Sequence, residues 1–381
     1  MSVRKRSWTT KRAEVKEAWI VDYVDRQGEQ HIKTFARKSD AVAEHAKVTV
    51  DVSKGIHTPE SRSITVAQAA EQWLDAVALE QRERSTLDHY RTYLDRHITP
   101  RIGAAKLATL STPHVHQFRD ALLRDLSRPL ARKVLTAFRA IIKDARRRGT
   151  LAHNVAEGVN IAGDKRGKRR PEIGRDIPSP DEVRRILAAA PENWRALLTV
   201  AAFTGLRASE LRGLRWADID LKTSTVQVRQ RADAWGKLGH LKSATSERAI
   251  PVGPFVVNTL KAFKLKSPSG DLVFPSRDSE PFAHVTLQRA GYWAAQCAAG
   301  VVNGVGKPKY PGLHTPRHFF ASWCINRRRD GGLELPLKLV QQRLGHATIA
   351  MTADTYGHLF PRGDDTEELA AAERALLTPV K

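Results

Sequence analysis

Residues 204–214 read Thr-Gly-Leu-Arg-Ala-Ser-Glu-Leu-Arg-Gly-Leu, and they follow an apolar stretch, 196–203, that is short enough to be a buried helix. Gly205 permits a bend in the chain, so Arg207 lies near the start of the next helix. An arginine in this position can bind a phosphate group with both arms of its guanidinium. Taken alone, an arginine three residues before Glu210 is more often part of a helix ion pair.

Two more short motifs follow in the C-terminal half. Residues 312–318 read Gly-Leu-His-Thr-Pro-Arg-His, which places His314 and Arg317 in an H-x-x-R pattern at the head of a helix. Residues 344–346 read Leu-Gly-His, and Tyr356 follows His346 by ten residues, on an expected short helix. Each motif alone has an ordinary structural explanation, since a histidine can cap a helix and a tyrosine usually packs with its hydroxyl in water.

The chain is strongly basic. Its 381 residues contain 63 Lys and Arg against 41 Asp and Glu, which gives a net charge of +22 at pH 7. This excess predicts a polyanionic partner, and nucleic acid is favoured over a membrane because no segment is apolar for the width of a bilayer. The basic residues 3–6 precede polar residues rather than the apolar core of a signal peptide. Cys297 and Cys324 lack the spacing of a zinc site or disulfide framework, so we expect the cytoplasm.

Residues 1–57 are expected to form a small module of strands and one helix. Residues 18–24 and 31–35 predict a hairpin, and Ser39 then caps a helix with Ala43, Ala46 and Val50 at near-helical spacing. Basic side chains gather where the chain enters this hairpin, and they are candidate DNA contacts: Arg4, Lys5, Arg6, Lys11 and Arg12.

Residues 64–160 predict a helical DNA-binding domain. Thr65 and Gln68 are placed as a capping box before the first of four amphipathic helices. Further helices begin near Ser85 and Thr112, and the last one ends at Gly149. Three arginines at the final turn offer charge to DNA phosphates: Arg146, Arg147 and Arg148.

A basic linker, 161–177, is expected to join this bundle to the last domain, because its composition is rich in charge, Gly and Pro. It is either a solvated tether or a segment that lies against DNA through Lys168, Arg169 and Arg170.

The last domain, 178–381, is expected to be mostly helical. Residues 179–182 predict a helix start with proline in its first turn. Three segments, 225–229, 239–242 and 248–252, predict a small three-stranded antiparallel sheet with Lys242 at or near one of its turns. Residues 367–373 predict a terminal helix that packs on its own chain or on a neighbouring copy.

The order of these motifs, Arg, Lys, H-x-x-R, L-G-H and Tyr, resembles the active-site signature of the tyrosine recombinases, or phage-type integrases. The resemblance is sharp over 178–359, and the bundle at 64–160 is similar to the core-binding (SAM-like) domain of that family. It implies a fold that is mainly α with small β-sheets, in several domains, with residues 1–57 binding separate arm-type sites.

The resemblance also implies a role for each residue. Arg207 and Arg317 would hold the scissile phosphate with His314 and His346, supported by Glu210. Tyr356 would be the nucleophile, and Lys242 would protonate the leaving 5′ oxygen, although Lys237 lies close by and is the alternative.

The chemistry supports these residue roles without the family resemblance, because phosphoryl transfer passes through an anionic transition state that suitably placed cations stabilise. Attack by tyrosine keeps the energy of the phosphodiester in a 3′-phosphotyrosyl bond, so neither metal nor ATP is expected as a cofactor. The family further implies a homotetramer on double-stranded DNA near the bacterial nucleoid, with DNA-bending accessory proteins and an excision factor as partners.

Three alternatives stay open at this point. A type IB topoisomerase would share the chemistry but act alone on one duplex, and the N-terminal modules favour recombination over it. A catalytically decayed DNA-binding regulator would retain only the binding, against which the complete residue set argues. A generic nucleic-acid coater would need the charge alone. The sequence does not distinguish integration from excision or give the attachment site.

Overall fold

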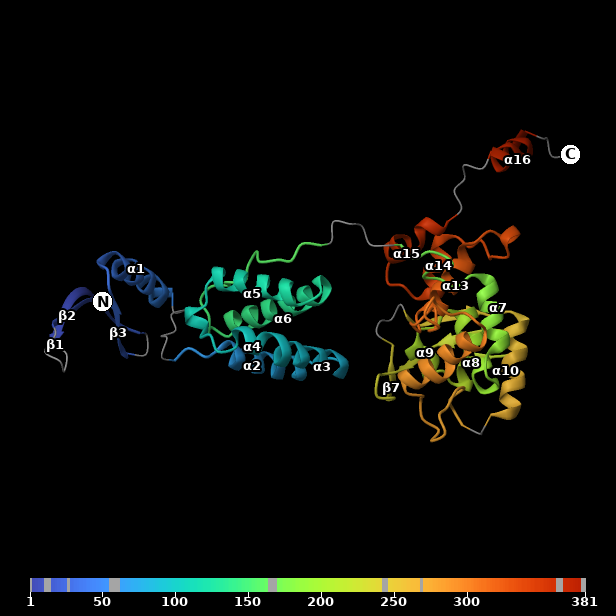
Figure 1. The fold of residues 1–381 in the computed structure, drawn as a ribbon, viewed down its shortest axis with the longest axis horizontal. Helices are drawn as coiled ribbons and strands as arrows, with labels where there is room; N and C mark the ends of the chain where they lie inside the picture. Colours follow the sequence, from blue (N-terminus) through green and yellow to red (C-terminus); the bar gives the residue numbers. More distant parts are fainter. Residues whose placement is uncertain are drawn as a thin grey trace. The chain divides into compact units, whose positions relative to one another are not determined.

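The computed structural model describes residues 2–9, 15–25, 28–54, 62–163, 170–241, 246–267, 270–360 and 366–377. The chain divides into two compact units, Met1–Arg166 and Gly167–Lys381, which we describe one at a time (Figure 1). Helices predominate in both units, and the strands form small antiparallel sheets. The predicted fold class, mainly α with small β-sheets, is therefore confirmed. Among the described helices, none combines the length and the apolar character needed to cross a membrane.

The N-terminal part of the first unit is a three-stranded antiparallel sheet with one helix. Strands β1 (Ser2–Thr9), β2 (Val15–Val24) and β3 (Gln30–Phe35) lie in the order β1-β2-β3. The sequence predicted only the β2–β3 hairpin and missed β1. The reason is that β1 is an edge strand whose side chains are almost all exposed, so it lacks the alternation of polar and apolar residues that marks a half-buried strand.

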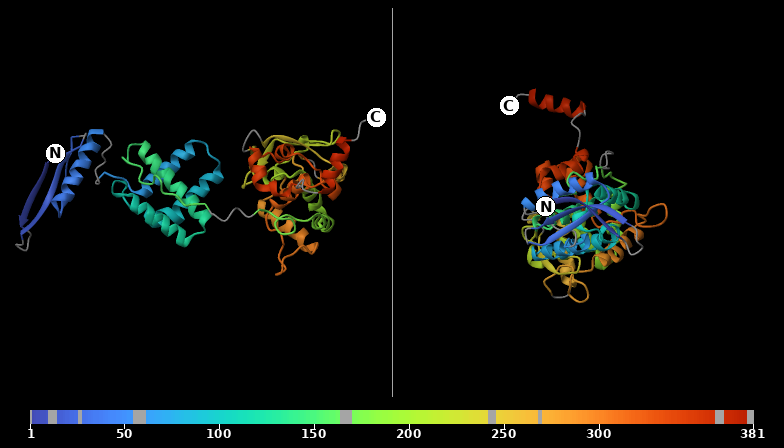
Figure 2. Two further views of the ribbon diagram at one scale, coloured as in Figure 1. Left: turned by 90° about the horizontal axis from the view of Figure 1, so that it is seen from above. Right: turned by 90° about the vertical axis from the view of Figure 1, so that its left-hand side faces the viewer.

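Helix α1 (Lys38–Lys54) lies along this sheet (Figure 2). Its buried residues are Ala41 and Val48, one heptad apart, together with the partly buried Val52. The predicted face of Ala43, Ala46 and Val50 is wrong, because all three are exposed. Alanine side chains are small and only weakly hydrophobic, so their spacing does not indicate which face of the helix is buried. The sheet that α1 covers decides which face is buried.

The remainder of the first unit is the predicted helical bundle. Thr65 and Gln68 form the expected capping box, with hydrogen bonds of 3.2 Å and 2.9 Å. Gly149 follows the last helix with a positive φ, as its position predicted. The elements are α2 (Val66–Leu79), α3 (Arg84–Tyr93), the π-helical η1 (Leu94–Ile98), α4 (Thr99–Ile102), η2 (Leu107–Thr109), α5 (Thr112–Asp125) and α6 (Arg128–Arg147).

One continuous core holds the bundle together. Trp73 from α2, Phe118 from α5 and Phe138 from α6 are buried in it. The irregular segment after α6 also contributes, since Leu151 and Ile161 are buried against the same core. The bundle therefore extends through residue 161.

The second unit begins earlier than predicted. Residues 164–169 lie outside the described residues, but residues 170–177 pack on the second unit rather than forming linker. Ile177 is fully buried, and the imidazole of His358 hydrogen-bonds the carbonyl of Pro171 at 2.7 Å. The charged composition of this segment hid the one apolar residue that anchors it.

The second unit consists mainly of helices (Figures 1 and 2). Pro180 stands at the first position of α7, which Ser179 and Glu182 cap as predicted. The helices are α7 (Pro180–Ala189), α8 (Glu192–Thr204), α9 (Ala208–Arg212), η3 (Trp216–Asp218), α10 (Pro254–Lys266), α11 (His284–Thr286), η5 (Leu287–Trp293), α12 (Ala294–Ala298), α13 (Thr315–Ile325), η6 (Arg328–Asp330), α14 (Leu337–Leu344), α15 (Ile349–Tyr356), η7 (Gly357–Leu359) and α16 (Thr366–Leu377).

The strands of this unit pair differently from the prediction. The three-stranded antiparallel sheet consists of β4 (Ile219–Asp220), β5 (Thr225–Val228) and β8 (Arg248–Pro251), in that order. The predicted third member, β7 (Leu238–His240), instead pairs with β6 (Gln230–Ala232) in a separate ribbon. A two-residue strand such as β4 gives no sequence pattern, and pairing is decided by which neighbours are near in space.

Candidate active site

Gly205 sets the position of Arg207. It ends α8 in the left-handed conformation, with φ of 61°. A Cβ at this position would lie 2.3 Å from the ring of Phe320, so both the backbone conformation and the packing require glycine. The chain turns here, and Arg207 becomes the N-cap of α9.

Arg207 is held at three points. Its backbone N–H donates to Glu210 Oε2 at 2.9 Å, and its Nη1 donates to Glu210 Oε1 at 2.6 Å. Its Nη2 donates to the carbonyl of Gly345 at 3.1 Å. The side chain is nonetheless 32 % exposed, so the guanidinium is fixed in direction while part of it remains open to an incoming anion.

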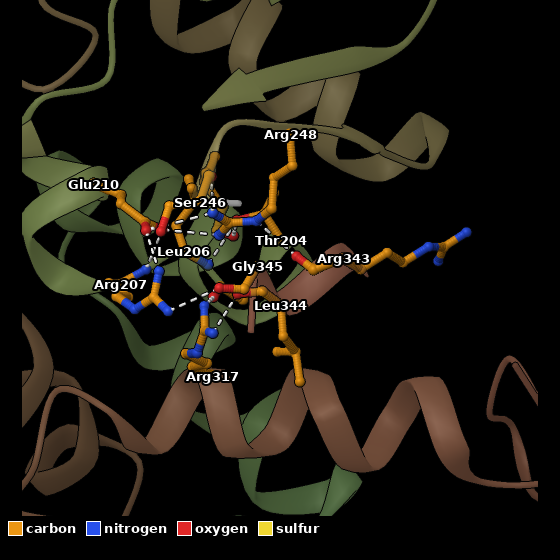
Figure 3. Close-up of polar contacts among 12 residues, drawn as sticks. Thr204, Leu206, Arg207, Glu210, Ser246, Arg248, Arg317, Arg343, Leu344 and Gly345 are labelled. Carbon is orange, nitrogen blue, oxygen red and sulfur yellow. Dashed lines mark hydrogen bonds and ion pairs between the residues drawn. The ribbon is translucent and has the colours of Figure 1, made fainter. Parts of the chain in front are cut away.

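Glu210 is shared between two arginines (Figure 3). Arg248 Nη2 donates to Glu210 Oε2 at 2.8 Å, and both side chains are almost completely buried. Burial by itself would raise the pKa of Glu210, but Arg248 and then Arg207 outweigh it and hold that pKa below its usual value. Glu210 is therefore a buried anion that holds the guanidinium of Arg207 in place through their hydrogen bond.

Arg248 is a residue that the sequence analysis missed. Its Nε donates to the carbonyl of Arg343 at 2.8 Å, and its Nη1 donates to the carbonyl of Ser246 at 2.8 Å (Figure 3). One signal could have found it, because Arg248 shares the inward parity of Ile250 on β8. An arginine at an inward strand position needs a buried partner.

Arg317 is the most deeply buried cation of the site. Its Nη1 donates to the carbonyl of Gly205 at 2.8 Å, and its Nη2 donates to the carbonyl of Leu344 (Figure 3). Burial, Arg207 and Arg248 lower the pKa of Arg317 to about 9, so it stays charged at neutral pH. Its Nε is buried and has no hydrogen-bond partner among the described residues.

His346 is positioned by a second left-handed glycine. Gly345 ends α14 with φ of 62°, and a Cβ there would lie 3.0 Å from the guanidinium of Arg248. The ring of His346 is 8 % exposed, and its Nδ1 hydrogen-bonds Thr352 Oγ1 at 2.9 Å. This bond leaves Nε2 as the ring nitrogen that can meet a ligand. Burial and then Arg317 lower the pKa of His346 to about 4.

His314 stands at the N-cap of α13, where part of the residue is open to solvent while its ring lies against His318 and close to Arg317. Loss of hydration, and then the neighbours His318 and Arg317, lower its pKa to about 4. At neutral pH both predicted site histidines are therefore uncharged, and each can donate one hydrogen bond and accept another.

Tyr356 is the last residue of α15, and it is 1 % exposed. Its ring stacks on His346, with centroids 6.4 Å apart and planes 3° from parallel. Burial raises the pKa of Tyr356 to about 12, although Arg317 opposes this rise. The hydroxyl hydrogen-bonds Nδ1 of His318 at 2.7 Å.

His318 is the second residue that the sequence analysis missed. It follows Arg317 on α13 and lies four residues after His314, so helical spacing puts both histidines on one face. That spacing was the available signal. The motif left its role open because H-x-x-R names only the first histidine.

The structure brings together five of the six predicted catalytic residues, from α9, α13, the turn after α14, and α15: Arg207, His314, Arg317, His346 and Tyr356. The sixth, Lys242, lies outside the described residues. Its alternative, Lys237, is exposed, and its backbone forms a turn with Asp233.

The predicted DNA contacts are exposed where they are described. Arg4 and Lys5 on β1 form surface ion pairs with Asp22 and Glu17. Arg6, Arg146, Arg147 and Arg170 are exposed, and the exposed Arg148 pairs with Asp144. Lys11, Arg12, Lys168 and Arg169 lie outside the described residues.

Metal ligands are grouped in one place within the described part of the chain. Asp25, Glu29 and His31 have ligand atoms within 4.8 Å of one another in the N-terminal module. Asp25 and His31 already hydrogen-bond each other at 2.9 Å, and Arg62 lies 3.5 Å from Asp25. This group belongs to the first unit and takes no part in the site around Tyr356.

Two family models match the chain. The Phage integrase family matches residues 179–362, and the N-terminal SAM-like domain of phage integrases matches residues 65–123. Tyrosine recombinase XerC of Xanthomonas axonopodis pv. citri is 30 % identical over 271 residues, which cover 67 % of this chain and 76 % of the relative. An integrase of Streptomyces ambofaciens is 26 % identical over 365 residues, 90 % of each chain.

Solved structures share the fold. The Tn1549 transposon integrase, in complex with a circular intermediate DNA, aligns with a TM-score of 0.63 at 16 % identity and covers 82 % of this chain and all of that one. A lambda integrase dimer bound to a COC′ core site aligns with a TM-score of 0.59 at 18 % identity, over 94 % of this chain and 95 % of that one.

Fold and family matches together define an integrase-type enzyme that cleaves and rejoins DNA. The chain belongs to the tyrosine recombinase family.

Proposed function

We propose that this enzyme is a site-specific recombinase that cuts DNA with Tyr356 through a 3′-phosphotyrosyl intermediate, and that it integrates or excises a mobile element or prophage. The observation that carries the proposal is the convergence of two fixed arginines and two neutral histidines on one buried tyrosine.

The charges of the site fit the reaction. Arg207 and Arg317 supply two positive charges where the phosphate of a DNA strand would become a crowded, more anionic transition state. His314 and His346, both uncharged, add hydrogen-bond donors without adding repulsion between cations.

The nucleophile needs help to ionise. With a pKa of about 12, forming the free tyrosinate of Tyr356 at pH 7 would cost about 7 kcal/mol, at 1.36 kcal/mol for each pKa unit. Arg317 lowers this cost, since it is the cation whose charge acts on the tyrosine. Lys242 is the proposed donor of a proton to the leaving 5′ oxygen.

The first unit is proposed to bind DNA at two kinds of site. The bundle from α2 to α6 would contact the core site, with Arg146, Arg147 and Arg148 on phosphates. The N-terminal sheet would contact arm-type sites through β1, where Arg6 is exposed.

The assembly is proposed to be a homotetramer on double-stranded DNA, since recombination requires two cuts on each of two duplexes. A lambda integrase tetramer bound to a Holliday junction, at 18 % identity and a TM-score of 0.57, supports this assembly. The transposon and phage integrases among the similar structures support a role in a mobile element. Accessory DNA-bending proteins and an excision factor are proposed as partners from the family resemblance alone.

Covalent capture tests the chemistry and finds the attachment site together. The full chain is incubated, in the presence of EDTA, with a pool of duplexes whose central sequences are randomised. Each duplex carries a nick, so that the short strand released by cleavage diffuses away. We expect a DNA adduct that resists detergent and that sequencing assigns to one motif. Tyr356→Phe should bind the same duplex without forming the adduct.

The alternatives give other outcomes. Binding to a defined motif without any adduct would refute the catalytic proposal in favour of a DNA-binding regulator. Relaxation of a supercoiled plasmid that lacks the captured motif, with no joining of two motif-bearing plasmids, would favour a type IB topoisomerase.

A further inference from the structure

We propose that His318 is a further catalytic residue, the general base that takes the proton from the hydroxyl of Tyr356 when the strand is cut and returns it when the strand is rejoined. This inference rests on the proposed function of Tyr356 as the nucleophile, and it assigns the base of that same site.

The geometry selects His318 from the three histidines around the tyrosine. Its Nδ1 lies 2.7 Å from Tyr356 Oη, which is the distance of a strong hydrogen bond to the reacting atom. The ring of His346 lies parallel to the tyrosine ring with the centroids 6.4 Å apart, and its Nδ1 hydrogen-bonds Thr352. His314 packs edge-on against His318, with the ring centroids 4.8 Å apart.

The surroundings keep His318 able to accept a proton. Burial and then Arg317 lower its pKa, while Asp176, from the segment before α7, opposes them. Among the described residues, the titratable and charged groups that face it are His314 and Arg317 from α13, Tyr356 from α15, and Asp176. A neutral imidazole with its proton on Nε2 presents the Nδ1 lone pair to the hydroxyl.

The step balances without any added reagent. The Oη–H bond of Tyr356 breaks and its proton moves to Nδ1 of His318, while Oη forms a bond to phosphorus. The bond from phosphorus to the 5′ oxygen breaks, and that oxygen takes a proton from the general acid. In rejoining, a 5′ hydroxyl attacks phosphorus and gives its proton to the conjugate base of the general acid, while the bond from phosphorus to Oη breaks and the imidazolium of His318 returns its proton to Oη.

His318 could instead only hold the hydroxyl in place, so the experiment must separate a base from a hydrogen-bond acceptor. Asparagine makes this separation, because its Oδ1 can accept the same hydrogen bond but binds no proton near neutral pH. His318→Asn thus keeps the positioning and removes the basicity, whereas His318→Ala removes both.

The measurement is the single-turnover rate of adduct formation between pH 5 and pH 8, at saturating enzyme, on the nicked duplex obtained by covalent capture. We expect the wild-type rate to fall on the acid side as His318 becomes protonated. His318→Asn and His318→Ala should both be slower by about 100-fold or more, the usual contribution of a general base, and should lose this acid-side fall. His284→Asn is the matched control, since burial also lowers the pKa of His284, and it should react like wild type.

Two results would overturn the inference: a His318→Asn variant that reacts at the wild-type rate while His318→Ala does not, or a slow His318→Asn variant that keeps the acid-side fall. Circular dichroism and the affinity for the same duplex establish that each variant is folded. Where His318→Asn is misfolded, His318→Gln is judged by the same criteria. Failure of the proposed function is distinct, because the wild type itself would then form no adduct.

Discussion

Glu210 accepts a hydrogen bond from the backbone of Arg207 at 2.9 Å and another from the guanidinium of Arg248 at 2.8 Å. One carboxylate thus joins the start of α9 to β8. Because Arg248 also donates to the carbonyl of Arg343, the same network reaches the turn that carries Gly345 and His346. The orientation of Arg207 consequently depends on a buried charge cluster that no DNA need contact.

Arg248→Ala should destabilise the second unit by about 3 to 5 kcal/mol, because it leaves the ionised and 2 % exposed Glu210 with half of its charge compensation. Urea unfolding followed by hydrogen exchange in α8 and α13 measures this loss. Arg184→Ala breaks the exposed Arg184–Asp181 pair and serves as the control, with little change expected. Equal stability of the two variants would show that the cluster is dispensable.

Stability of the second unit should fall in acid. The pKa of His346 is about 4 in the folded chain against 6.5 for an unperturbed histidine, so between these values the unfolded chain binds more protons. Stability is then complete above pH 6.5 and decreases as the pH falls toward 4, by at most about 3 kcal/mol from this residue. Glu210, with its pKa below the ordinary 4.5, adds a loss of the same sign at still lower pH.

His346→Gln isolates the histidine contribution. Its unfolding free energy, measured by urea titration from pH 4 to pH 7, should depend on pH less steeply than that of the wild type. His240→Gln, on the exposed strand β7, should leave the slope unchanged. A His346→Gln profile parallel to the wild type would mean that the pKa of His346 is the same in the folded and the unfolded chain, which would contradict the lowered pKa.

Arg207→Ala should abolish cleavage while DNA affinity stays close to that of the wild type. Removing a placed cation from a phosphoryl-transfer site costs about 1,000-fold or more in rate, whereas the chain has 63 basic residues to bind DNA. Adduct formation and affinity are measured on one captured duplex. Lys266→Ala, which removes an exposed cation of the same unit, is the comparison. A parallel loss of affinity and rate would instead favour a generic nucleic-acid coater.

Lys242→Ala should block cleavage of ordinary DNA, and a duplex with sulfur in place of the bridging 5′ oxygen should restore it. A thiolate leaves without a proton, since thiols have a pKa of about 8.5, whereas an alkoxide needs a general acid. Lys237→Ala should cleave both duplexes like the wild type. The reverse result would assign the general acid to Lys237.

The sequence by itself determined the local features of this protein. Helix caps at Thr65 and Ser179, the turn at Gly205 and the helix ends before Gly149 and Gly345 follow from residues a few positions apart, whose backbone preferences act without distant partners. The ordered motifs from Arg207 to Tyr356 likewise pointed to residues that converge in the structure.

Only the tertiary structure decided which residues from distant parts of the chain contact one another. Strand β5 pairs with β8, which lies 20 to 26 positions later in the chain. The packing of residues 170–177, the contact of Arg248 with Glu210 and the contact of His318 with Tyr356 join residues from 38 to 187 positions apart. Such pairings are selected by burial and by the need of each buried polar group for a partner, and neither condition exists until the chain has folded.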